Sequence, residues 1–179
     1  MPKVHSSKLS KNKEFSMAFD AFIKIDGIDG ESTDDKHKGW IEMTSYNHGV
    51  NQAVSSTASS SGGASAERAT FRDFSFTKEL DIASPALALA CADGTHIDEI
   101  TVELCRAGKD KVKFMEYKFK NCLISGVEVG GTGSGEIPTE SVAINYGKIN
   151  WAYTQQKREG GGASGNMATG WDLQKNCKA

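Results

Sequence analysis

The stretch of this sequence whose composition most suggests a chemical site is GGTGSGE, at positions 130–136. Backbone amides in a glycine-rich loop can wrap phosphate groups, but a phosphate-binding loop also needs a lysine, and Glu136 stands where that lysine should be. The dinucleotide-binding pattern also fails, because Gly131 and Gly133 would require a glycine at position 136. The residues that follow alternate as a strand does, so no helix N-terminus is available for an anion. We therefore exclude a nucleotide site and interpret the stretch as a glycine turn.

Other residue types that perform catalysis or bind metals lack the spacing that the chemistry needs. A serine-hydrolase turn centred on Ser134 would need glycines at positions 132 and 136, which are Thr and Glu. The acidic stretch from Asp26 fails the calcium-loop spacing, since position 12 of that loop would be His37, so we expect a solvated turn there. The histidines and cysteines form neither a zinc-protease motif nor a C-x-x-C pair. We predict no catalytic residue, no metal site and no cofactor, and hence not an enzyme; we expect the cysteines to be buried thiols, namely Cys91, Cys105, Cys122 and Cys177.

Residues 108–121, GKDKVKFMEYKFKN, mix lysines with aromatic side chains. Such a mixture can neutralise and stack on a single-stranded nucleic acid. We favour instead a strand that turns Met115, Tyr117 and Phe119 toward the core and coats its other side with lysines, because most of the chain is acidic. No nucleic-acid partner is therefore expected.

Two tryptophans keep a second function class open. Trp40 and Trp151 could act as stacking platforms in a β-sandwich that binds a carbohydrate or a protein ligand. Both lie in alternating segments, where burial in a core or an interface is the commoner outcome. The binding module is therefore the alternative function.

Alternation of apolar and polar residues predicts most of the fold. About seven segments with this pattern are separated by turn residues; the first begins at Phe19, and the last changes phase near Gly147. One short helix is predicted between Ser84 as N-cap and Gly94 after its last turn, with Pro85 in its first position. We therefore predict a mainly β fold: a small β-barrel or sandwich of two packed antiparallel sheets with one short flanking α-helix.

The chain is expected to form one domain over residues 17–157, since 179 residues are few for two domains. Residues 1–16 lack periodicity, and the net charge of −2 divides into +3 for them and −5 for the rest, so we interpret them as a disordered extension. Residues 158–179 are predicted to be a glycine-rich tail whose C-terminus docks through Trp171. The sequence has no apolar run of membrane-spanning length and no secretory signal, which predicts synthesis in the cytosol without membrane insertion.

Longer motifs remain that serve no catalytic chemistry. They are MAFDAFIKIDGIDGESTDDKHKGWIEM from Met17, FSFTKELDIASPALALACADGTHI from Phe74, GGTGSGEIPTESVAINYGKINWAYTQQK from Gly130 and GWDLQKN from Gly170. In this order they resemble the Hcp (haemolysin-coregulated protein) family, the tube protein of bacterial type VI secretion systems. The resemblance covers nearly everything from Met17 onward.

The resemblance implies a subunit of which six copies close into a ring, with rings that stack into a tube. The tube would lie inside a contractile sheath beneath a spike, and it would carry or chaperone small effector proteins in its lumen. It would leave the bacterial cytoplasm for the extracellular space or a target cell without a signal peptide. The expected partners are therefore other copies of the chain, spike and sheath proteins, and small effectors.

The resemblance also implies roles for particular residues. The second strand of the family lines the lumen, which places Tyr46, Asn47 and His48 there. Gly131, Gly133 and Glu136 are expected at a turn beside a subunit boundary. A serine-rich loop would reach toward the adjacent ring, and the residues expected to stack rings are Val50, Gln52, Ser55, Ser56, Ser59, Ser60, Gly62 and Gly63.

Overall fold

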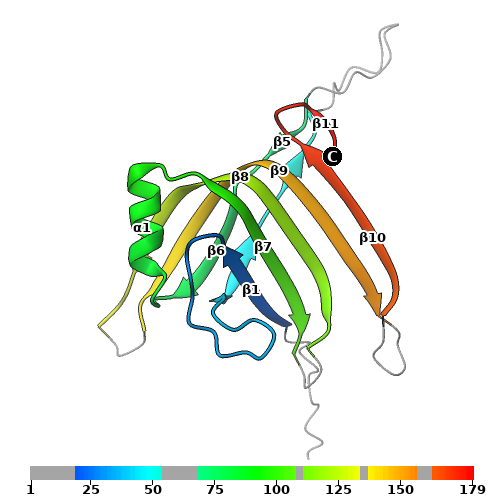
Figure 1. Cartoon of the computed structure of the whole chain (residues 1–179). Coiled ribbons are helices and arrows are strands. Elements are labelled where there is room, and N and C mark those ends of the chain that lie inside the picture. Colours follow the sequence, from blue (N-terminus) through cyan, green and yellow to red (C-terminus); the bar gives the residue numbers. More distant parts are fainter. Residues whose placement is uncertain (1–18, 54–67, 108–110, 134–136, 157–162) are drawn as a thin grey trace, which may run out of the picture.

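The computed structural model describes residues 19–53, 68–107, 111–133, 137–156 and 163–179. Within them, a nine-stranded antiparallel sheet, a two-stranded sheet and one helix make up the fold (Figure 1). This confirms the predicted mainly β fold with one short flanking helix. No helix in these ranges has the length and apolar character needed to cross a membrane.

Two long strands, β8 (Lys113–Gly130) and β9 (Thr139–Gln156), form the centre of the large sheet. They pair antiparallel along nearly their whole length. The N-terminal half of β8 also pairs with β7 (Ile97–Arg106), and β7 pairs with β1 (Phe19–Ile25). Alternation in KVKFMEYKFKN and in CLISGVEVG predicts two separate strands, but β8 runs through both segments without a break.

The other side of β9 has two different partners. Its first half pairs with β6 (Phe74–Glu79) and its second half with β10 (Ala163–Asp172), which in turn pairs with the short β11 (Cys177–Lys178). The small second sheet consists of β4 (Val50–Asn51) and β5 (Thr70–Phe71). The expected glycine-rich tail thus contains a regular strand, which lies at the far side of the sheet from helix α1 in Figure 1.

The second predicted strand changes partner in its middle. β2 (Ile41–Met43) pairs with β1, whereas β3 (Ser45–Asn47) pairs with β6. Only Thr44 separates the two pieces, and its backbone N–H donates to the Thr77 carbonyl oxygen at 2.8 Å. Residues 41–47 therefore connect the β1 edge with the β6 edge, which is compatible with the predicted small barrel or sandwich.

Helix α1 (Ser84–Asp93) ends as predicted but begins differently. Gly94 takes the left-handed conformation with φ 67°, which confirms its place after the last turn. The cap position belongs to Ala83, whose side chain caps nothing, so the prediction that Ser84 is the N-cap is wrong. The Ser84 hydroxyl instead donates to Glu140 Oε1 at 2.7 Å, because a buried carboxylate lies within its reach.

The predicted change of phase near Gly147 is confirmed. The buried side chains of β9 are Glu140, Val142, Ile144 and Tyr146 before this glycine and Ile149 after it. Opposite Gly147, Asn121 of β8 has a left-handed φ of 54°. A Cβ on Gly147 would lie 3.2 Å from the Asn121 Cβ. The glycine therefore lets β8 and β9 approach closely at the point where the alternation of β9 changes phase.

One apolar cluster fills the interior and includes side chains from the large sheet and from α1. Two charged side chains, Lys78 and Glu140, are as deeply buried, each with 1% of its surface exposed. They lie in the inward phase of β6 and β9, in line with their apolar neighbours. The largest fully buried apolar side chains are Phe74, Phe76, Phe119, Ile23, Ile25, Ile41, Leu87, Ile100, Ile144 and Ile149.

Candidate functional site

The residues expected to face a lumen point in two directions. Asn47 is exposed, whereas Tyr46 and His48 are half-buried. The Tyr46 ring stacks on Phe74 with centroids 5.9 Å apart, and His48 Nε2 lies 2.7 Å from the Tyr146 hydroxyl. Asn47 is therefore the member of this group with an exposed side chain, and the lumen-facing role stays a prediction.

The contact between His48 and Tyr146 is a structural hydrogen bond. The Tyr146 hydroxyl donates its single proton to the Arg72 carbonyl oxygen at 3.1 Å, so we assign His48 as the donor to the phenol oxygen. Burial lowers the pKa of His48 and raises the pKa of Tyr146 well above its usual range. Both side chains are neutral at neutral pH, so the pair does not form a charged site.

The residues expected to stack rings lie only partly in the described chain. Val50 is 45% exposed and pairs with Phe71 across the small sheet, and Gln52 is exposed just beyond it. The other residues expected to stack rings lie in the sequence between β4 and β5, the two strands of the small sheet. The residues outside the described ranges are Ser55, Ser56, Ser59, Ser60, Gly62 and Gly63.

The glycine turn between β8 and β9 distinguishes its two described glycines. A Cβ on Gly131 would lie 3.1 Å from the Pro138 Cβ, closer than ordinary packing allows. A Cβ on Gly133 would meet nothing within 4 Å of its own subunit. Glu136 lies outside the described residues. The sequence grouped these positions together, but of the two described glycines Gly131 alone is restricted by packing against Pro138.

An apolar row that the sequence analysis missed crosses three strands of the large sheet. Met115 lies opposite Tyr153, and Tyr153 lies opposite Met167 of β10. Tyr153 is 49% exposed and Met167 is 76% exposed. In the sequence, Met167 and Trp171 share one phase of alternation, but Gly165 and Gly170 beside them make that pattern weak. The row gives β9 and β10 an apolar surface that the described residues of the subunit leave in water.

The residues proposed to bind a carbohydrate or a nucleic acid pack within the subunit instead. Trp40 meets the His37 ring edge-on at 4.9 Å, and Trp151 stacks on Phe71 at 6.4 Å, so both tryptophans pack inside the subunit. Residues 113–120 confirm the favoured interpretation, because their aromatic and methionine side chains pack on the core while Lys120 is 51% exposed. Neither segment presents an open aromatic surface with the lysines that a nucleic acid would need.

The acidic loop between β1 and β2 is packed rather than simply solvated, which corrects that expectation. Ser32 and His37 are buried, with 6% and 2% of their surfaces exposed. A hydrogen bond from Lys111 holds the pKa of the Asp34 carboxyl far below its usual value. Ser32 donates to Glu42 Oε1 at 2.6 Å, which ties the loop to β2.

The cysteines do not share one environment. Cys105 and Cys122 are buried as expected, whereas Cys91 is half-buried and Cys177 is exposed, so the expectation of four buried thiols is wrong for these two. Burial raises the pKa of Cys105 to about 11 and that of Cys122 to about 12. Of the four, Cys105 alone is grouped with other possible metal ligands, His37 and Glu103, among the described residues.

Comparison with known proteins gives consistent matches. The family model described as "Type VI secretion system effector, Hcp" matches residues 22–153. Protein hcp1 of Pseudomonas aeruginosa PAO1 is 33% identical over 164 residues, covering 91% of this chain and 100% of that protein.

Solved structures agree with the sequence matches. A structure described as a type six secretion system protein has a TM-score of 0.85 and 35% identity, covering 90% of this chain and 100% of that one. Hcp1 from Salmonella typhimurium has a TM-score of 0.74 and 31% identity, covering 91% of this chain and 100% of that one. The chain therefore belongs to the Hcp family of type VI secretion proteins, which are structural tube proteins and not enzymes.

Proposed function

We propose that this subunit assembles side by side into a homo-hexameric ring and that the rings stack into the inner tube of a type VI secretion system. The observation that carries the proposal is the exposed apolar pair that Tyr153 of β9 and Met167 of β10 form on paired strands. Tyr153 and Met167 stand there with 49% and 76% of their surfaces exposed. A lone subunit leaves this surface in water, whereas a neighbouring copy would cover it.

The apolar row lies on a face that is continuous with the core. Side chains directly opposite on paired strands share one face of the sheet, so Met115, Tyr153 and Met167 form a row on it. Farther along the same face, Ile149 is buried and Trp171 is half-buried against the core cluster. Burial therefore decreases along this face from Ile149 and Trp171 toward Tyr153 and Met167, as it does where a core extends across two subunits.

The backbone of β10 supports the same contact. β11 pairs only with Trp171 and Asp172, so the edge of β10 from Gly165 to Thr169 has no strand partner among the described residues. An exposed strand edge accepts another strand, and in a homo-oligomer another copy supplies it. A contact between different surfaces closes into a ring when its rotation divides the circle, and six copies is the number that the family resemblance implies.

The remaining parts of the proposal rest on membership of the family. Stacking is assigned to Val50, Gln52 and the segment between β4 and β5, and Asn47 is the exposed residue proposed for the lumen. The open space beside Gly133 fits a subunit boundary. The tube would move with spike and sheath proteins from the bacterial cytoplasm to the extracellular space or a target cell, carrying small effectors.

Size-exclusion chromatography with light scattering tests the ring contact. The wild-type chain should have six times its subunit mass of 19.2 kDa, and Met167→Asp should reduce the mass to that of one subunit. Asn166→Asp is the matched control, because it adds the same charge on the same strand but to the opposite face. Its ring should persist. Wild-type protein that stays monomeric when concentrated, or a Met167→Asp ring of unchanged mass, would refute the contact.

A further inference from the structure

Three side chains that carry metal-binding atoms meet where β7 ends beside the acidic loop. His37 Nε2 lies 3.0 Å from Glu103 Oε2 and 4.0 Å from Cys105 Sγ, and the three donor atoms all lie within 4.8 Å of one another. We propose that this cluster binds one divalent metal ion of the zinc type, with His37, Glu103 and Cys105 as its protein ligands.

The donor set and its spacing suit that ion. Imidazole nitrogen, thiolate sulfur and carboxylate oxygen are the protein ligands of zinc, and the first two favour it over calcium or magnesium. Zinc bonds of about 2.0–2.3 Å in tetrahedral geometry place donors about 3.3–3.6 Å apart. The spacings at His37 Nε2, 3.0 and 4.0 Å, lie on either side of that range. Small side-chain rotations would therefore complete the triangle.

Neighbouring side chains already hold the His37 imidazole in the orientation that a metal ligand needs. Its Nδ1 lies 2.9 Å from Asp34 Oδ1, so the ring can donate there and direct Nε2 toward Glu103. The ring stacks on Phe22 with centroids 4.1 Å apart and planes 2° apart, and Trp40 contacts it with its ring nearly perpendicular. These contacts hold the imidazole in one orientation before any ion arrives.

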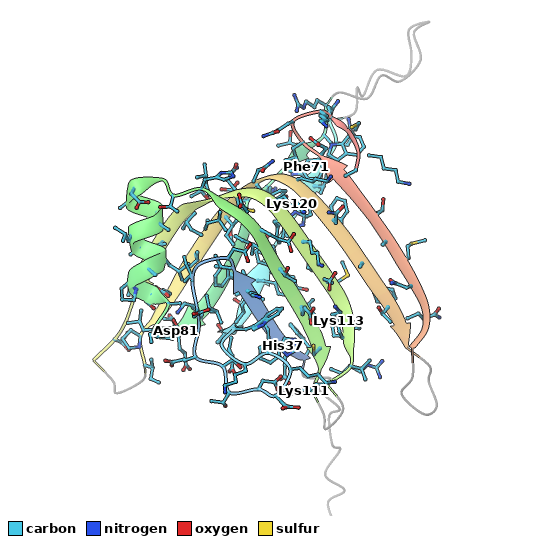
Figure 2. The ribbon with its side chains drawn as sticks, in the orientation of Figure 1. His37, Phe71, Asp81, Lys111, Lys113 and Lys120 are labelled. Atoms are coloured by element: carbon cyan, nitrogen blue, oxygen red, sulfur yellow. The ribbon has the colours of Figure 1, made fainter. Side chains whose placement is uncertain are left out.

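Two lysines take the carboxylate oxygens that face away from His37. Lys111 Nζ lies 2.5 Å from Asp34 Oδ2, and Lys113 Nζ lies 2.8 Å from Glu103 Oε1. The oxygens directed at the imidazole are therefore Asp34 Oδ1 and Glu103 Oε2. Figure 2 shows His37, Lys111 and Lys113 at the end of the sheet away from Phe71. Each carboxylate thus has one oxygen for its lysine and one for the proposed centre or its imidazole ligand.

Access and charge also permit binding. A pocket of about 370 Å³ opens onto the cluster and is lined by Trp40, Lys111 and Lys113, so an ion can enter and a water molecule can complete four-coordination. His37 faces a carboxylate with each ring nitrogen, so the charges around the cluster favour a cation. The Cys105 thiol would release its proton when it becomes the thiolate ligand. The ion would cross-link the acidic loop, through His37, to β7, through Glu103 and Cys105.

Cobalt titration of the full-length protein tests the proposal, because a thiolate bound to Co²⁺ gives a near-ultraviolet charge-transfer band and tetrahedral Co²⁺ gives strong visible bands. The Cys177→Ser protein is the starting point, since its exposed thiol is removed. It should bind one equivalent with both bands, and Zn²⁺ should displace the cobalt. In this background Cys105→Ser should lose the thiolate band, whereas Cys122→Ser, the matched change at a buried cysteine elsewhere, should keep it. Asp34→Asn should weaken cobalt binding about 10–100-fold.

Absence of a thiolate band at saturating cobalt in the Cys177→Ser protein would overturn the proposal, whatever the other variants do. A band that survives Cys105→Ser or disappears with Cys122→Ser would also overturn it. Circular dichroism should accompany each variant to show that it is folded. The Met167→Asp subunit should bind cobalt equally well, so this result does not depend on ring assembly.

Discussion

Replacing Lys78 with methionine is expected to destabilise the subunit by about 3–5 kcal/mol, because it would strand a buried carboxylate. Lys78 Nζ lies 2.6 Å from both Glu140 Oε1 and Asp81 Oδ1, and it also bonds the Glu79 carbonyl oxygen at 2.9 Å and Ser84 Oγ at 3.1 Å. Without the ammonium, the described residues leave Glu140 one donor, the Ser84 hydroxyl at 2.7 Å. Even in the intact network, Glu140 Oε2 has no hydrogen-bond partner among the described residues.

Removing the carboxylate instead of the ammonium should lower the free energy of unfolding by less. In Glu140→Leu, Lys78 keeps Asp81, whose side chain is 10% exposed, and we expect a loss of about 1.5–3 kcal/mol. The double variant Lys78→Met/Glu140→Leu removes both charges and fills the space with apolar groups, an exchange that is often neutral or stabilising. It should therefore be more stable than Lys78→Met alone, with a coupling energy of at least about 3 kcal/mol between the two sites.

Urea unfolding followed by circular dichroism measures these free energies. All variants should be compared at one protein concentration, because subunit association adds to the apparent stability by mass action. Lys120→Met is the matched control: its ammonium lies 3.3 Å from Glu99 Oε2 but its side chain is 51% exposed, so the pair is worth less than about 1 kcal/mol. Single losses that add within about 0.5 kcal/mol, or a Lys78→Met loss no larger than that of the control, would refute the argument.

Three other changes test separate parts of the structure. Gly131→Ala should cost about 1–3 kcal/mol in urea unfolding, because its Cβ would lie 3.1 Å from a rigid proline, whereas Gly133→Ala should cost less than about 0.5 kcal/mol; equal losses would contradict this. The depressed pKa of Asp34 means that its stabilisation is complete above the ordinary value of 3.8 and is lost as the pH falls below it, so Asp34→Asn should flatten the pH dependence of the urea midpoint in acid; an unchanged slope would count against it. A thiol reagent should modify exposed Cys177 in the native protein but Cys122, with its pKa near 12, only after denaturation. Mass spectrometry measures both rates, and equal rates of modification in the native protein would contradict this.

Alternation predicted the sheet because a half-buried strand repeats every two residues, whatever its partners. It did not predict the length of β8, since Asn121 breaks the period while Lys120 and Cys122 on either side of it stay paired with β9. It also missed β10, whose glycines weaken the pattern that pairing with β9 makes regular. The tail from Ala163 to Asp172 is ordered by its neighbour more than by its own composition.

The buried polar groups were the harder part of the site to predict. Charged residues are usually outside, so the alternating patterns of β6 and β9 were interpreted without asking where Lys78 and Glu140 point. Their positions share the phase of Phe76 and Val142, a signal that was present in the sequence. No comparable signal brings His37 to Cys105, because their contact joins a loop to a strand 68 residues away.

Two parts of β10 are stabilised differently. Near its C-terminal end, Trp171 packs on the core cluster and β11 pairs with the strand, so the subunit itself stabilises this part. Near Met167 the side chains are exposed on both faces of the strand, and the described residues supply a partner only through β9. A strand that buries so little apolar surface gains little to offset the entropy of ordering its backbone. We therefore infer that the apolar row contributes its stabilisation through another copy, which is why Met167→Asp should affect assembly while sparing the fold.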